Sequence, residues 1–186
     1  MKPEEFAVES MPSPTTFIQY KGVWDMQDLY ETLADFFRDQ KFKFYEVVYK
    51  HKHPSPFGAE RQYVWRGERN VEEYYKYVLE IFIHTYDASD IEAVTKDGTK
   101  RTFTKGRIRI QFRGRVNFDY EKKWEGNAFY AQLRNFYHKY VIQKKIESIY
   151  WDEFYYKVFN KLHNLVQGRL KMESEQYEAR EMAGVH

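Results

Sequence analysis

Four arginines alternate with apolar residues in one short segment of the chain, residues 107–118. The odd positions include Arg107, Arg109, Arg113 and Arg115, and the even positions hold Ile108, Ile110, Phe112, Gly114, Val116 and Phe118. Successive side chains of a strand point to opposite faces, so the spacing predicts a strand with one core-facing side and one guanidinium side. Guanidinium groups bind phosphate and carboxylate in bidentate geometry, which makes this side a candidate binding surface for an acidic partner.

The arginine side has two interpretations. With Lys43 and nearby aromatic rings it could form a basic, stacking platform for nucleic acid, above all RNA. Alternatively, the arginines pair across the sheet with carboxylates of the same chain, and the candidates are Glu46, Glu80 and Glu92. The choice depends on whether these carboxylates reach the arginines.

The charge of the chain is unevenly distributed. The formal net charge is only +2, which is too small to indicate a polyanion partner. Residues 96–115 nevertheless hold eight basic and one acidic side chain, whereas the N-terminal helix region is acidic. This segregation would allow the acidic surface of one copy to meet the basic surface of another.

The chain is also rich in aromatic residues, with 17 tyrosines and 15 phenylalanines. Its last third holds more tyrosines than one narrow buried helix face requires: Tyr130, Tyr137, Tyr150, Tyr155 and Tyr156. Aromatic side chains are enriched at protein interfaces. These tyrosines are either core residues or the candidate contacts of an interface. The interface that we consider is one between two copies of the chain.

No motif for catalysis or cofactor binding is present. The chain has no cysteine, no glycine-rich phosphate loop, no Gly-x-Ser-x-Gly and no His-Glu-x-x-His. His51 and His53 share one strand face, but the sequence places no third or fourth ligand beside them, so no metal site is predicted. We therefore expect a non-enzymatic protein without metal or cofactor. No run approaches the ~18 apolar residues of a membrane span, and a cytoplasmic location is expected.

The elements that position these residues follow from the hydrophobic pattern. A short strand at 16–22 precedes a helix that begins near Asp25, and strand-like segments fill residues 42–118, with a hairpin turn at Asp97-Gly98 and a kink at Gly106. Two amphipathic stretches follow, and the apolar stripe of each is expected mainly in the core. One of them carries Phe129, Leu133, Phe136 and Tyr140. Asn127 and Ser148 are candidate N-caps, and one long bent helix is the alternative.

The predicted fold class is therefore α+β: an antiparallel sheet of about five or six strands, with one N-terminal helix and one or two long C-terminal helices packed on one face. We expect a flexible arm over residues 1–15, a single domain over 16–172 and a polar tail over 173–186. In the order of its elements the chain resembles the helix-grip architecture of START-like lipid-binding domains. That resemblance implies a curved sheet around the C-terminal helix and a ligand cavity. No diagnostic motif of the family is present, so no residue of this chain is assigned a role from it.

Three functions follow as hypotheses. The first is an interaction or assembly domain that associates with itself or with another protein. The second is nucleic-acid binding through the arginine side. The third is a carrier of a hydrophobic ligand.

Overall fold

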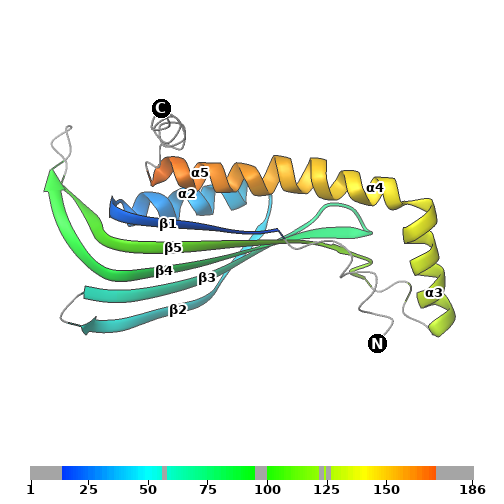
Figure 1. Ribbon diagram of the computed structural model, residues 1–186, viewed down its shortest axis with the longest axis horizontal. Helices are drawn as coiled ribbons and strands as arrows, with labels where there is room; N and C mark the ends of the chain where they lie inside the picture. The colour runs from blue at the N-terminus through cyan, green and yellow to red at the C-terminus, as the bar shows by residue number, and fades with distance from the viewer. Residues whose placement is uncertain (1–13, 56–57, 95–99, 122–123, 125–126, 171–186) are drawn as a thin grey trace, which may run out of the picture.

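The computed structural model describes residues 14–55, 58–94, 100–121, 124 and 127–170 (Figure 1). Five antiparallel strands form one sheet in the order β1-β5-β4-β3-β2. Their bounds are β1 Thr15–Trp24, β2 Lys43–Ser55, β3 Gly58–Asn70, β4 Tyr75–Val94 and β5 Lys100–Phe118. The helices pack on one face of this sheet, which confirms the predicted α+β class. The predicted arm, the polar tail and the Asp97-Gly98 turn lie outside the described residues, except for residues 14 and 15.

The two longest strands, β4 and β5, bend strongly toward the helices (Figure 1). Their register shifts between Tyr86 and Ser89, so that two residues of β4 oppose the single residue Gly106 of β5. A side chain at Gly106 would meet the Tyr86 carbonyl oxygen at 2.8 Å, so only glycine fits there. The predicted kink at Gly106 is therefore confirmed, and its cause is a β-bulge.

The helix α2, Met26–Asp39, covers the edge of the sheet formed by β2 and β3. Asp25 caps it, because its carboxylate accepts a hydrogen bond from the backbone N–H of Asp28 at 3.0 Å. The predicted apolar stripe is buried, with Leu29, Leu33, Phe36 and Phe37 turned to the core. Phe37 stacks on Phe44 of β2 at 5.3 Å between ring centroids, which fixes the helix against that strand.

A long helix crosses the same face of the sheet. It comprises α4 Gln143–Ser148, the π-helical segment η2 Ile149–Asn160 and α5 Lys161–Arg169, and it runs without a break. The buried side chains of this helix include Phe154, Val158, Phe159, Leu162 and Val166. The predicted cap at Ser148 is wrong, because the helix continues through it and its hydroxyl donates to Asp152 at 2.9 Å. We call the side of the sheet that faces α2 and this long helix the covered face, and the opposite side the open face.

A second, shorter helix precedes the long one and stands at an angle to it (Figure 1). It consists of α3 Ala128–Phe136 and the π-helical segment η1 Tyr137–Val141. Asn127 is its cap, as predicted, with Oδ1 accepting from the N–H groups of Phe129 and Tyr130. Ile142 breaks the helical backbone, with φ −115° and ψ 12°, and forms the elbow between the two helices. The C-terminal third is thus a bent pair of helices.

Candidate functional site

The short helix α3–η1 exposes its apolar side chains. Phe129 is 66% exposed, Phe136 57% and Tyr140 66%. Tyr130, Leu133 and Val141 are also exposed. We call these six residues the outward face. The sequence pattern favoured a core position for this stripe, and that interpretation is wrong here, because the opposite side of the helix is the one that meets the rest of the molecule.

Polar groups hold the inner side of α3–η1 in place. Arg134 and Asp119 are both buried, and their side chains pair at 3.4 Å between Nη1 and Oδ2. One turn further on, His138 hydrogen-bonds with the Tyr74 hydroxyl through its Nε2. The rings of His138 and Phe118 are also in edge contact. A helix with a polar inner side and an apolar outer side is the reverse of an ordinary surface helix.

The groups below α3–η1 have shifted pKa values. Burial, with a further contribution from the Arg134 charge, lowers the pKa of His138, whereas the Asp119 carboxylate acts in the opposite direction. Burial, followed by the Asp119 charge, raises the pKa of Tyr74 to about 12. At neutral pH the imidazole is therefore uncharged and the phenol keeps its proton. The Tyr74 hydroxyl can donate to the unprotonated Nε2 of His138.

Acidification is expected to loosen this contact. Because the pKa of His138 is lower in the folded state, the unfolded chain binds the proton first, and stability falls as the pH drops below about 6.5. The loss from one such group is at most about 1.4 kcal/mol per pH unit. Urea unfolding at about pH 7.5 and about pH 5.5 measures it. His138→Gln should show a smaller loss than the unmodified chain, and an unchanged pH dependence would contradict this role.

The structure separates the five predicted interface tyrosines. Tyr130 and Tyr156 are exposed, and Tyr150 is buried in the core. Tyr137 stacks on Trp124 at 6.1 Å, and Tyr155 packs against Phe159 at 5.8 Å. Only Tyr130 therefore belongs to the outward face, whose other members are mostly phenylalanine and aliphatic residues.

The arginine side of β5 lies on the open face, as the alternation predicted, and the even positions of the strand are buried. Two of its arginines have carboxylate partners. Arg115 pairs with Glu80 at 2.8 Å, and Arg107 pairs with Asp87 at 2.6 Å. Of the three predicted acidic partners only Glu80 reaches an arginine of β5. Glu46 lines a pocket between α2 and the sheet, and Glu92 lies opposite Thr102.

The two remaining arginines of the arginine side, Arg109 and Arg113, differ from these. Elsewhere on β5, Arg101 lies 3.7 Å from the Asp25 carboxylate. Among the described residues, no carboxylate lies within ion-pair distance of Arg109 or Arg113. Arg109 instead lies over the ring of Phe17, 4.9 Å from its centroid. Lys43 is exposed and lies opposite Glu68, whose carboxylate already binds Arg66 at 2.6 Å. The open face is thus basic, with part of its charge neutralised within the chain.

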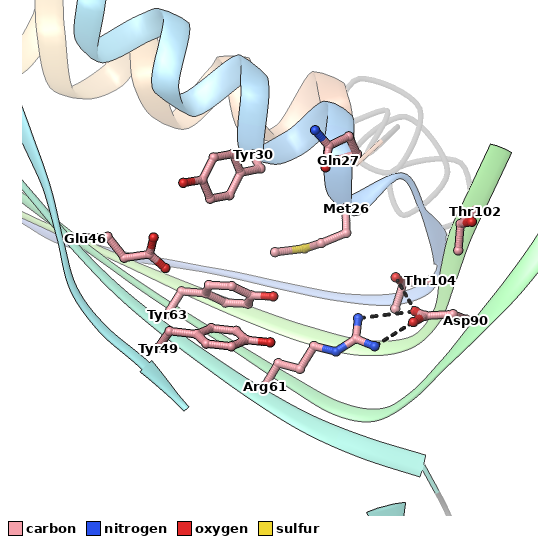
Figure 2. A pocket seen from close by; sticks show the side chains of 10 residues that line it. All are labelled: Met26, Gln27, Tyr30, Glu46, Tyr49, Arg61, Tyr63, Asp90, Thr102 and Thr104. Carbon is pink, nitrogen blue, oxygen red and sulfur yellow. Dashed lines mark hydrogen bonds and ion pairs between the residues drawn. The ribbon is translucent and has the colours of Figure 1, made fainter. Parts of the chain in front are cut away.

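A pocket of about 430 Å³ opens at the other end of the molecule, between the first turn of α2 and the curled sheet (Figure 2). Three tyrosines line it, Tyr30 from α2, Tyr49 from β2 and Tyr63 from β3. Its remaining lining residues are Met26, Gln27, Glu46, Arg61, Asp90, Thr102 and Thr104. Sequence reasoning placed Glu46 on the arginine side and missed this pocket.

A β-bulge brings two of these residues together. Glu46 and Tyr49 are three positions apart, and in a regular strand they would point to opposite faces. The register of β2 shifts between Glu46 and Val48, so both residues lie on the covered face, opposite Trp65 and Tyr63. The sequence contained no turn or glycine signal for this bulge.

Other candidate sites find no support in the described part of the chain. No group of three or more metal-ligating side chains occurs among the described residues. The side chains of His51 and His53 lie outside what the structure describes. None of the described helices is both long and apolar enough to cross a membrane. No family model matches the sequence, and a search of curated proteins returns no relative.

Proposed function

We propose that the protein is a non-enzymatic interaction domain that associates with a second copy of itself through the outward face of α3–η1. The observation that carries this proposal is the reversed polarity of the helix. Six large apolar side chains face solvent while Arg134 and His138 face inward. Exposed apolar patches above a few hundred Å² mark interaction sites, and these six side chains expose on the order of 600 Å².

The spacing of the outward face favours a second copy as the occupant. Phe129, Leu133, Phe136 and Tyr140 follow one another at intervals of four, three and four residues. This is the spacing of a coiled-coil seam, in which the same stripe on another helix supplies the matching surface. Two identical helices related by a twofold axis can bury such a stripe mutually, since the interface of a symmetric dimer is made by the same patch on both copies.

The size of the face agrees with a reversible dimer. A standard interface buries roughly 800 Å² on each partner, and the outward face supplies most of that area. Sedimentation equilibrium of the purified chain over a range of micromolar concentrations tests the proposal. We expect a reversible increase in mass from 22.8 kDa toward twice that value. A single 22.8 kDa species at the highest concentration would overturn it.

The nucleic-acid alternative has weaker support. Two of the four arginines on β5 are paired with Asp87 and Glu80, which reduces the charge available for phosphate. What favours it is the exposed Arg109 over Phe17, a cation beside an aromatic ring. Phosphate contacts would make the affinity for a short RNA fall steeply with salt, and charge reversal at Arg109 and Arg113 would abolish it.

A further inference from the structure

The pocket between α2 and the sheet carries a net negative charge that comes from one residue. Its charged lining consists of Glu46, Arg61 and Asp90. Arg61 binds Asp90 through both terminal nitrogens, at 2.6 and 3.2 Å, and Thr104 donates a further hydrogen bond to Asp90 at 3.0 Å. The Arg61–Asp90 pair is therefore neutral as a unit. The Glu46 carboxylate is the remaining charge of the lining.

Aromatic rings surround the space next to Glu46. Figure 2 shows Tyr49 and Tyr63 side by side on the sheet, with Tyr30 and Met26 above them and the Tyr30 hydroxyl on the side of Glu46. The Tyr49 and Tyr63 rings lie 5.0 Å apart. Burial, followed by the Glu46 charge, raises the pKa of Tyr30, and burial also raises the pKa of Tyr63, to about 12. These phenols are therefore neutral at physiological pH.

A buried tryptophan holds two of these rings in position. Trp65 is fully buried, and Tyr30 packs edge-on against it with ring centroids 4.7 Å apart. Tyr63 contacts the same tryptophan in an edge arrangement at 6.3 Å. Side chains fixed by packing lose little entropy when a ligand binds, so the two walls formed by Tyr30 and Tyr63 are preorganised.

We infer that this pocket binds an organic ammonium ion, with the cation in the space between Tyr30 and the Tyr49–Tyr63 pair and beside the Glu46 carboxylate. The negative faces of aromatic rings attract cations, and aromatic cages bind quaternary and methylated ammonium groups in this way. Hard metal ions require several oxygen ligands, and this lining offers them one carboxylate outside the Arg61–Asp90 pair. A volume of about 430 Å³ admits a small ammonium compound with room for a substituent.

Choline and its neutral isostere 3,3-dimethyl-1-butanol test the inference, because the two differ in charge and share their shape. We expect isothermal titration calorimetry to detect saturable choline binding at millimolar or lower concentration, and binding of the alcohol at least about tenfold weaker. Equal affinity for the two compounds would overturn the inference, and so would the absence of saturable choline binding.

A matched pair of variants assigns the binding to the pocket. Tyr49 and Tyr45 lie on the same strand, are each 53% exposed, and project from opposite faces of the sheet. Tyr49→Leu and Glu46→Gln should each weaken choline binding about tenfold, whereas Tyr45→Leu should leave it unchanged. Unaltered binding in Tyr49→Leu, or an equal loss in Tyr45→Leu, would place the ligand elsewhere and refute the assignment. Figure 1 shows the first turn of α2, which lines the pocket, and α3 at opposite ends of the molecule, so this result is independent of self-association.

Discussion

Glutamate in place of both Leu133 and Phe136 is expected to convert the proposed dimer into a monomer. Both side chains point to solvent in one chain, so the fold of the monomer should survive the change. In the dimer the same positions would be buried at the centre of the seam, where the apolar contacts are lost and two carboxylates per copy must be desolvated. We expect the dissociation constant to rise at least about 100-fold, measured by sedimentation equilibrium.

Tyr45→Glu is the control for this experiment, because Tyr45 is an exposed aromatic residue on the open face of the sheet. It should leave the dimer intact. Circular dichroism and urea unfolding should show that all variants keep the native fold. If the double variant associates as strongly as the unmodified chain, the outward face of α3–η1 is not the interface.

The second large effect is a loss of stability, and it is expected when the ion pair beneath α3 is broken. Asp119→Asn leaves the buried Arg134 guanidinium without its counter-charge, and breaking a buried pair in this way costs about 3–5 kcal/mol. Asparagine suits the test because Asp119 has a positive φ of 51°, a conformation that asparagine also tolerates. The free energy of unfolding from urea denaturation measures the loss. Since the pair anchors α3, self-association should weaken in the same variant.

Asp35→Asn provides the matched control, because Asp35 pairs with Arg38 on the exposed side of α2 at 2.6 Å. The side chains of that pair are 62% and 76% exposed, compared with 2% and 8% for Asp119 and Arg134. An exposed pair contributes at most about 1 kcal/mol. Equal effects of the two substitutions would show that Arg134 is not anchored by Asp119.

Local pattern was sufficient to predict α2 and β5. The cap at Asp25 and the buried stripe of α2 follow from helical spacing alone, and the buried even positions of β5 follow from simple alternation. Both elements pack on the core through their apolar side, so the buried residues are the ones that the hydrophobic pattern predicts. The bend at Gly106 was likewise visible as a glycine within a strand.

The orientation of α3 could not be predicted in this way. Its periodicity identifies an apolar stripe, but which side faces inward depends on contacts that are distant in sequence. Tyr74 and His138 are 64 positions apart, and Arg134 meets an aspartate that ends the sheet. The tyrosine pocket was missed for a similar reason, because a bulge in β2 turns Glu46 and Tyr49 to one face.

The most direct test of the central claim is an intermolecular distance at the outward face. The chain has no cysteine, so a single cysteine at Gln132 can carry a nitroxide spin label without background. Two packed helices lie about 8–10 Å apart between axes, so pulsed dipolar spectroscopy should detect a short distance between labels at 132, and a longer one for labels at Lys157 on the other helix. A dimer without a short distance at 132, or the absence of any intermolecular coupling, would contradict self-association through α3–η1.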